Sequence, residues 1–313
     1  MGERRATRSF RGRRTRDGAG VSLTRIFGFG NEKELDPFLL LDAFGSKDPR
    51  EYLPGFPWHP HRGIETVTYL LEGSVRHGDS LGNAGLIGPG ELQWMTAGSG
   101  IIHEEMPLAS PNGVLGFQLW VNLPRTEKMK EPAYRGVLAG EVPRIRVPGG
   151  EVGVLAGDFG GVRGPVEGVA RNPAYFEVRL EPGASLTLEA PSEETVFIYV
   201  FEGSLAEAGD RTSVGDRASV GDRASTRAGD RARDGDRACA GAGDCLLFAA
   251  PGEDDKITVT SGAEGARLIF ARARPLREPI AWRGPIVMNS EEELDLAFYE
   301  FRAGTFVKAK RSR

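Results

Sequence analysis

The sequence predicts an all-β protein built of two tandem β-barrels with a short C-terminal helix. Its 313 residues exceed the size at which a single hydrophobic core is usual, so two domains are expected. Its 43 glycines and 20 prolines are scattered through most of the chain, which favours many short strands joined by tight turns. A strand pattern in the first half also recurs in the second half, which indicates a pair of related domains.

In the first half, apolar and β-branched runs alternate with turn signals. The stretch DPFLLLDAF, residues 36–44, is predicted to be buried, and IETVTYLL, residues 64–71, predicts a core strand that enters a turn. After a Gly-Pro-Gly turn at 88–90, ELQWMT predicts another strand. Successive hairpins of this kind describe an antiparallel barrel or jelly roll. The last strand, GFQLWVNLP, places four apolar residues on one face: Phe117, Leu119, Val121 and Leu123.

The second half repeats this pattern more faintly. TVFIYVFEGS, residues 195–204, echoes TVTYLLEGS, residues 66–74, and AGDCLLFAAPG echoes GPGELQWMTAG. The similarity indicates an internal duplication. Near the C-terminus, Ser290 is a suitable N-cap for an amphipathic helix packed on a barrel. The apolar residues expected on that helix are Leu294, Phe298 and Phe301.

These patterns divide the chain into four parts: a basic tail at 1–20, the first barrel at 21–140, the second barrel at 141–288, and the C-terminal helix and tail at 289–313. The basic tail is expected to be solvated, with a targeting or nucleic-acid-binding arm as the alternative. A low-complexity insertion at about 207–243 repeats Gly-Asp-Arg between small residues. Because it has almost nothing to bury, it is predicted to be disordered or a long surface hairpin; a partner-binding arm is the alternative.

The composition argues against several classes of protein. A net charge of -4 gives no overall attraction to nucleic acid or to an anionic membrane, so direct binding to either is not expected. No apolar run approaches the roughly 18 residues of a membrane span, and no apolar segment follows the N-terminal arginines as in a signal peptide. The two cysteines, Cys239 and Cys245, do not suggest a disulfide-stapled secreted domain. We expect a cytoplasmic protein, or a nuclear one if its source is eukaryotic.

Histidines are concentrated in two short motifs. His59 and His61 stand at positions i and i+2, and on an extended segment such side chains point the same way. His103 and Glu105 repeat this spacing. If both segments lie on strands of one barrel, three imidazoles and one carboxylate meet inside it. That ligand set suits iron, copper, nickel, manganese or zinc.

The alternative is that these histidines bind no metal, as is usual for a single histidine. Three of the four histidines fall into the two motifs, which favours a metal site, and the second half of the chain has no histidine at all. His77 is interpreted as an ordinary surface or core residue. Trp94 and Met95 are interpreted as core residues, and Glu65 as a partner of Arg62 or a group that orients a ligand.

HPHRGIETVTYLLEG followed by PGELQWMTAGSGIIHEEMP resembles the hallmark of the pirins, which belong to the cupin superfamily. LDPFLLLDAF and, near the C-terminus, LREPIAWRGPIVMNSEEEL are similar too. The resemblance implies a bicupin whose second cupin is metal-free. Glu65 occupies the place of the glutamate ligand of the general cupin motif, whereas the pirin pattern gives that role to Glu105, and we follow the pirin pattern. The implied ligands of one Fe2+ are His59, His61, His103 and Glu105.

Similarity to pirins implies two different functions. The first is a flavonol dioxygenase of the quercetinase type, in which a carboxylate removes the 3-hydroxyl proton of a planar aromatic substrate and O2 adds across the ring to release carbon monoxide. Glu105 is then the candidate catalytic base. The second is a regulatory binding protein whose iron oxidation state changes its affinity for a transcription-related or metabolic partner. A metal with a purely structural role is a third alternative. The bicupin is expected to be a monomer. Candidates for an apolar pocket mouth are Phe56, Trp58 and Leu119.

Overall fold

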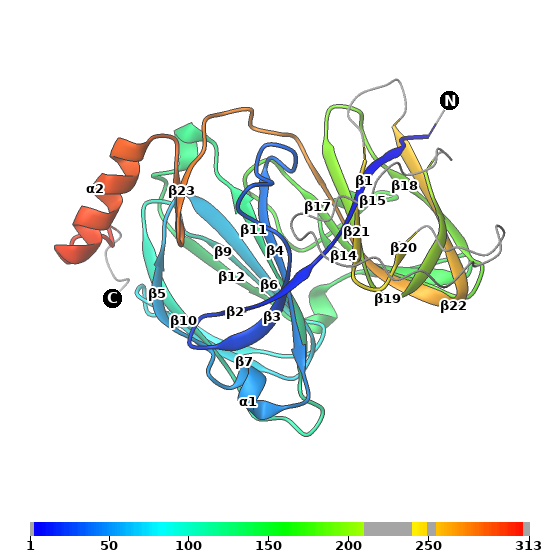
Figure 1. Ribbon diagram of the computed structural model, residues 1–313, viewed down its shortest axis with the longest axis horizontal. Coiled ribbons are helices and arrows are strands. Elements are labelled where there is room, and N and C mark those ends of the chain that lie inside the picture. Colours follow the sequence, from blue (N-terminus) through cyan, green and yellow to red (C-terminus); the bar gives the residue numbers. More distant parts are fainter. Residues whose placement is uncertain (1–2, 210–239, 249–254, 309–313) are drawn as a thin grey trace, which may run out of the picture. The chain divides into compact units, whose positions relative to one another are not determined.

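The computed structural model describes residues 3–209, 240–248 and 255–308, and these fold into two compact units (Figure 1). Each unit combines segments that are distant in the sequence. The first barrel comprises Arg13–Val142, Gly164–Asn172 and Pro275–Arg313; the second comprises the chain up to Gly12 together with Pro143–Arg163 and Pro173–Arg274. The all-β prediction is confirmed. No helix within the described ranges is long and apolar enough to span a membrane.

Residues 13–142 of the first barrel form antiparallel strands, one short helix, α1 (Pro49–Tyr52), and two 3-10 turns at Arg125–Glu127 and Ala139–Glu141. Its strands are β2 (Arg13–Asp17), β3 (Val21–Phe27), β4 (Phe38–Ser46), β5 (Phe56–His61), β6 (Ile64–Glu72), β7 (Val75–Asp79), β8 (Ala84–Ile87), β9 (Leu92–Thr96), β10 (Ile101–Pro107), β11 (Val114–Asn122) and β12 (Ala133–Val137). They form a seven-stranded sheet, β12-β9-β6-β11-β4-β3-β2, and a four-stranded sheet, β5-β10-β7-β8. The candidate ligands lie on β5 and β10, which are therefore neighbours in one sheet.

The core of the first barrel follows the alternation read from the sequence. The buried face of β11 and the residue after it carry the four expected residues, all fully buried: Phe117, Leu119, Val121 and Leu123. Trp94 and Met95 on β9 are buried as well, in agreement with their interpretation as core residues. Strand β4 buries most of the apolar stretch predicted around residues 36–44.

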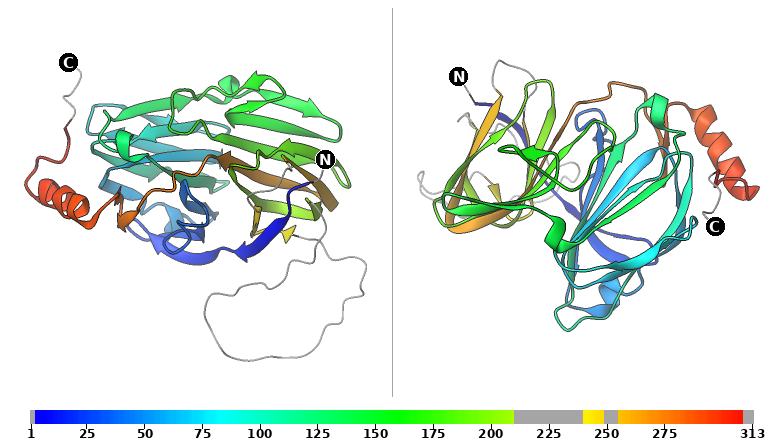
Figure 2. Two further views of the ribbon diagram at one scale, coloured as in Figure 1. Left: turned by 90° about the horizontal axis from the view of Figure 1, so that it is seen from above. Right: turned by 180° about the vertical axis from the view of Figure 1, so that it is seen from behind.

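The C-terminal segment forms a hairpin, β23 (Ala281–Arg283) and β24 (Ile286–Met288), followed by α2 (Glu291–Arg302). Ser290 caps α2 as predicted, because its hydroxyl accepts a hydrogen bond from the backbone N–H of Glu293. Two further views show α2, in red, at the edge of the first barrel (Figure 2). The predicted apolar face is wrong in one position: Leu294 is fully buried, but Phe301 is 40% exposed, and Ala297 takes the buried position instead.

The second barrel is a single nine-stranded antiparallel sheet with a small extra hairpin, β15 (Asp158–Phe159) and β16 (Val162–Arg163). The sheet strands are β1 (Ala6–Arg11), β13 (Arg144–Val147), β14 (Gly150–Ala156), β17 (Ala174–Leu180), β18 (Ser185–Glu189), β19 (Thr195–Ala208), β20 (Ala240–Gly241), β21 (Asp244–Phe248) and β22 (Lys256–Ala273). The long strands β19 and β22 pair along most of their lengths. One apolar cluster, with the stacked rings of Phe176 and Phe270, fills the interior.

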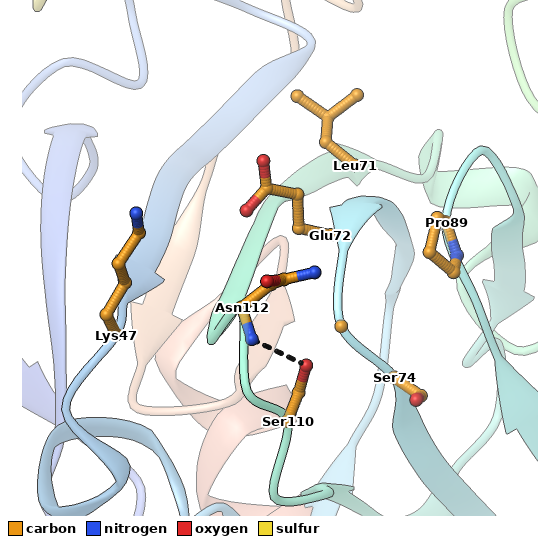
Figure 3. Close-up of a pocket in the computed structure, with 8 residues that line it drawn as sticks. Lys47, Leu71, Glu72, Ser74, Pro89, Ser110 and Asn112 are labelled. Carbon is orange, nitrogen blue, oxygen red and sulfur yellow. Dashed lines mark hydrogen bonds between the residues drawn. The ribbon is translucent and has the colours of Figure 1, made fainter.

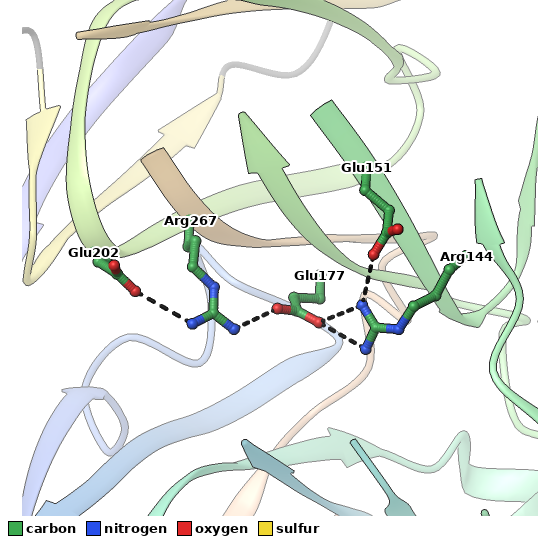
Figure 4. Close-up of polar contacts among 5 residues, drawn as sticks. All are labelled: Arg144, Glu151, Glu177, Glu202 and Arg267. Atoms are coloured by element: carbon green, nitrogen blue, oxygen red, sulfur yellow. Dashed lines mark hydrogen bonds and ion pairs between the residues drawn. The ribbon is translucent and has the colours of Figure 1, made fainter. Parts of the chain in front are cut away.

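A chain of ion pairs crosses the strands of the second barrel (Figure 4). The carboxylate of Glu177, which is 5% exposed, pairs with Arg144 at 3.1 Å and with Arg267 at 2.7 Å. Glu151 and Glu202 extend the network from the two arginines. This row of alternating charge links β13, β14, β17, β22 and β19.

The predicted boundaries need two corrections. Residues 1–20 were expected to be a solvated tail, but β1 pairs with β21 and β2 pairs with β3. The guanidinium of Arg4 is buried and donates to the carbonyl oxygens of Ala190, Pro191, Glu194 and Phe248. The many arginines of this segment did not indicate these strand pairings, because a sheet edge can pair with the backbone of any segment. Residues 275–288 belong to the first barrel, not the second. Most of the insertion expected at 207–243 lies outside the described residues.

Candidate metal centre

Three histidines from two paired strands meet inside the first barrel. In the antiparallel pair β5–β10, His103 stands opposite His59, and Ile101 stands opposite His61. On β10 the odd-numbered residues from Ile101 to Pro107 are buried and the even-numbered ones are partly exposed, so His103 and Glu105 both point inward. The potential ligand atoms of His59, His61 and His103 all lie within 4.8 Å of one another. The structure thus brings together three of the four predicted ligands.

Two of these imidazoles are oriented by carbonyl groups. His59 Nδ1 lies 2.8 Å from the oxygen of Pro57, and His61 Nδ1 lies 3.0 Å from the oxygen of Pro285. A carbonyl oxygen can only accept, so each Nδ1 carries the proton and donates it. In the neutral rings, each Nε2 therefore presents a lone pair. These two Nε2 atoms are 3.1 Å apart.

The third imidazole is buried without polar partners. Within the described part of the chain, neither ring nitrogen of His103 has a hydrogen-bond partner. Burial, and then the neighbouring rings of His61 and His59, lower the pKa of His103 well below its usual range. Burial, and then His59, lower the pKa of His61 in the same way, although the carbonyl of Pro285 opposes that shift. Both rings are therefore neutral at pH 7, the form that binds metal.

The arrangement fits a transition-metal ion. Two Nε2 lone pairs at 3.1 Å repel each other unless a cation lies between them, and a buried imidazole without any partner is otherwise costly. Two nitrogens that each lie ~2.1 Å from one metal at a right angle are ~3 Å apart. The separation between His59 and His61 matches that value. Imidazole ligands suit iron, copper, nickel and zinc.

Glu105 lies beside the three-histidine group but is not one of its members. Both carboxylate oxygens are hydrogen-bonded: Oε1 accepts from the hydroxyl of Thr68 at 2.6 Å, and Oε2 accepts from Nε2 of Gln118 at 2.9 Å. The pairing of β10 with β5 also shifts between His103 and Glu105, so Glu105 stands opposite Phe56. Its predicted role as a ligand stays a prediction.

The remaining titratable residues of this barrel have other partners. His77 is buried, and its Nε2 lies 2.5 Å from the hydroxyl of Tyr134, whose ring it stacks on. The expected pairing of Glu65 with Arg62 is not found in the described residues. Glu65 accepts hydrogen bonds from Trp94 Nε1 and from the hydroxyl of Thr96. Arg62 instead pairs with a residue of α2.

A pocket of about 740 Å³ opens at the histidines. Aromatic rings follow one another along it, from His61 to Trp120, Trp282 and Phe29, with centroid separations of 5.0, 6.1 and 5.7 Å. Gln118, which holds Glu105, also lines the pocket. This wall therefore offers flat apolar surface next to the imidazoles.

A charged pair also lines this pocket. Arg25 donates Nε and Nη2 to the two carboxylate oxygens of Asp42, at 2.9 and 2.7 Å. Burial raises the pKa of Asp42 to about 6, although Arg25 opposes that shift. The pocket thus combines an apolar wall with polar groups that can bind substituents of a ligand.

The sequence-based choice of residues for the pocket mouth was partly wrong. Phe56 lines the pocket, but Leu119 is fully buried in the core, and Trp58, 54% exposed, is not among the lining residues. Trp120 was the better choice, because its position alternates with the buried residues of β11. No local signal points to Trp282, which comes from the C-terminal hairpin.

A second hollow, of about 460 Å³, lies around the turn between β6 and β7 and contains no histidine (Figure 3). The side chains of Lys47 and Glu72 line it, and the only hydrogen bond drawn there joins the backbone N–H of Asn112 to the hydroxyl of Ser110. It presents no group of ligands like that of the larger pocket.

Two family models match this chain. The family model described as Pirin matches residues 20–121, and the model described as Pirin C-terminal cupin domain matches residues 175–307. The chain belongs to the pirin family. Its two barrels are accordingly the two cupin domains of a pirin, and both matched histidine motifs lie in the first.

Individual pirin relatives cover nearly the whole chain. A Pseudomonas aeruginosa protein named "Putative quercetin 2,3-dioxygenase" is 41% identical over 92% of this chain and 93% of its own length. A "Pirin-like protein" of Caulobacter vibrioides is 38% identical over 95% of this chain and 96% of its own length. The crystal structure of quercetin 2,3-dioxygenase from Acinetobacter baumannii superposes with a TM-score of 0.80 at 27% identity, covering 98% of this chain and 99% of that one.

Proposed function

We propose that this pirin is a metal-dependent dioxygenase that cleaves flavonols of the quercetin type with O2, and that the metal is Fe2+ bound by His59, His61, His103 and Glu105. The observation that carries the proposal is the group of three imidazoles, two of which line a pocket with an aromatic wall. The names of the relatives from Pseudomonas aeruginosa and Acinetobacter baumannii support the same reaction class.

The metal, when bound, supplies a Lewis acid for the substrate oxygens and a place for O2. Everything else comes from the protein. The carbonyl oxygens of Pro57 and Pro285 hold the rings of His59 and His61 in the tautomer whose Nε2 faces the site. The burial of His103 excludes water from that side.

Glu105 is the proposed base that accepts the substrate's 3-hydroxyl proton at Oε2. This oxygen already accepts a hydrogen bond from Gln118, and Gln118 lines the pocket. Only this side chain would then stand between the carboxylate and bound substrate. Thr68 holds the other oxygen. Together the two donors fix the position of the carboxylate, which acts as the general base when it is not bound to the metal.

The pocket walls fit a planar polyhydroxylated substrate. Trp120 and Trp282 supply aromatic faces against which a flat ring can stack. Asp42 and Arg25 supply an acceptor and a donor for ring hydroxyl groups away from the histidines. The substrate would thus be held by its faces and oriented by its hydroxyls.

The test measures the metal content of the purified protein beside oxygen uptake with quercetin, for the wild type and His61→Ala. We expect one iron per chain and metal-dependent oxygen consumption in the wild type, and neither in the variant. Iron without oxygen consumption would favour the regulatory binding protein, whose partner affinity should then differ between ferrous and ferric forms. A folded wild type that binds no metal even after reconstitution would refute the proposal.

A further inference from the structure

The orientation of His61 depends on a residue 224 positions later in the chain. His59 finds its carbonyl partner two residues away, on its own strand, whereas the partner of His61 is Pro285, in the turn of the β23–β24 hairpin. Since a carbonyl oxygen accepts only, this contact selects the tautomer of His61 that carries its proton on Nδ1. The hairpin must therefore be docked for Nε2 of His61 to be presented as a ligand.

The docking is made by backbone groups immediately after His61. Arg62 forms a β-bridge with Ile286, and the N–H of Val287 donates to the carbonyl of Arg62 at 3.1 Å. Gly63 has a φ of +78°, and a Cβ added there would lie 1.9 Å from the oxygen of Val287. Only glycine allows the hairpin to approach this closely.

A buried lysine joins the two sides of this contact. Lys128 is 1% exposed, and its Nζ donates to the carbonyls of Gly63 and Val287, both at 2.9 Å, and to Oδ1 of Asn122 at 2.7 Å. The three protons of the ammonium group thus have three acceptors: one belongs to Gly63, two residues after His61, and one to Val287 of the hairpin. A buried ammonium group is tolerated only with such partners.

A buried arginine anchors the residues after the hairpin. Arg62 is 1% exposed, forms an ion pair with Glu300 on α2 at 2.8 Å, and donates to the carbonyl of Phe306 at 2.9 Å. Its guanidinium also lies 4.3 Å from the ring centroid of Phe306. Glu300 pairs in addition with Lys308 at 2.7 Å. The residue next to His61 therefore holds both α2 and the segment beyond it.

We propose that residues 281–306 are a positioning element for the histidine site, held in place by Lys128 and Arg62, and that they fix the tautomer and orientation of His61 through the carbonyl of Pro285. This inference rests on the proposed metal site. Trp282 of this segment also lines the pocket, but Lys128, Arg62 and the carbonyl of Pro285 act on the site through His61. Partners that orient metal-bound imidazoles typically change metal affinity 10–100-fold when removed.

The test compares Lys128→Met with Lys130→Met in the full-length protein. Lys130 lies two residues away, is partly exposed and pairs with Glu127 at 2.9 Å, so it controls for loss of a lysine. Co2+ affinity is measured by competition with a chelator. We expect Lys128→Met to bind Co2+ about 10–100-fold more weakly than the wild type and Lys130→Met to stay within about twofold. Equal affinity of all three proteins would overturn the inference.

A second measurement does not depend on metal. The 15N chemical shifts of the imidazoles in the chelator-stripped chain report which ring nitrogen carries the proton. We expect His61 to carry it on Nδ1 in the wild type and to become a mixture of tautomers in Lys128→Met. An unchanged tautomer would count against the inference. A wild type that binds no Co2+ but has His61 protonated on Nδ1 would refute the metal site and leave the positioning role intact.

If Lys128→Met does not fold, Glu300→Gln takes its place in both measurements. Glu300 is closer to the surface, and its loss weakens the Arg62 anchor without leaving a buried charge wholly unpaired, since Arg62 keeps the carbonyl of Phe306. We expect a smaller loss of Co2+ affinity, about threefold to tenfold, in the same direction. Wild-type affinity together with an unchanged His61 tautomer in this variant would overturn the inference.

Discussion

The two barrels differ most in what they bury. Of the buried polar and charged side chains in the described residues, seventeen belong to the first barrel and four to the second. The strands that echo each other in the sequence show the same contrast: β6 carries Thr66 and Thr68 inside the first barrel, whereas the corresponding part of β19 buries Val196 and Ile198. The two barrels thus share a strand pattern but differ in the polarity of their interiors.

This difference indicates that the first barrel is adapted to bind a metal and the second mainly to be stable. Each buried polar group must find a partner or cost stability, and the first barrel meets this demand with local networks such as Thr68–Glu105–Gln118. The second barrel has less of this demand: an apolar cluster fills its interior, and its buried Glu177 is paired with Arg144 and Arg267. We therefore expect substitutions in the first barrel to change metal binding and those in the second to change stability.

The largest expected effect comes from removing a central imidazole. His103→Ala should weaken metal binding by more than about 100-fold, because it removes a ligand rather than a group that orients one. Metal titration followed by competition with a chelator measures this. The matched control is His77→Gln, a buried histidine of the same barrel outside the three-histidine group, which should keep its metal. Equal affinity of His103→Ala and the wild type would remove His103 from the site.

The second barrel should show the opposite response. Phe270 is fully buried and stacks on Phe176 with ring centroids 5.5 Å apart. Phe270→Ala should lower the free energy of unfolding by about 3–5 kcal/mol, measured by urea denaturation, with the metal content per folded chain unchanged. Leu86→Ala, at a side chain 61% exposed, is the control and should change it by less than about 0.5 kcal/mol. A loss of metal in folded Phe270→Ala would show that metal binding also depends on the core of the second barrel.

The buried lysine of the first barrel should make stability depend on pH. Burial lowers the pKa of Lys128 to about 7 from 10.5, with Glu278 and Glu293 opposing the shift. Between pH 7 and 10.5 the unfolded chain then binds more protons than the folded one, so stability should rise with pH across this window. Urea unfolding at pH 6 and pH 9 should show a rise for the wild type that is absent from Lys128→Met. A rise of the same size in Lys128→Met would assign it to another group.

The smallest effect is expected from the ion-pair chain of the second barrel. Glu177→Gln removes the carboxylate shared by Arg144 and Arg267 and should cost about 1–3 kcal/mol of stability. The more exposed Glu202 has one of these partners, so Glu202→Gln should cost less than about 1 kcal/mol. Both losses should shrink at high salt. Thermal unfolding at low and high salt measures both losses. Equal losses in the two variants would contradict the larger contribution expected of Glu177.

Much of the fold and the centre of the site could be predicted from local patterns. Alternation along β11, the β-branched run of β6 and the N-cap at Ser290 are set by neighbours in the sequence, and the structure agrees with them. The spacing of His59 and His61 predicted side chains on one face of an extended segment, and the same rule holds for His103 and Glu105 on β10. For these features, chain geometry over two to four residues is sufficient.

Contacts between distant segments were decided only by the tertiary structure. Nothing near Arg62 in the sequence indicated that its partner is Glu300 rather than Glu65, or that Pro285 and Trp282 complete the surroundings of His61. The pairing of β1 with β21 was hidden for the same reason. Such contacts depend on which sheet edges and loop ends meet once both cores have formed, and hydrophobic periodicity records only which face of each strand is buried. The sequence alone therefore determined the strands and the histidine motifs, while folding decided which remote groups orient them.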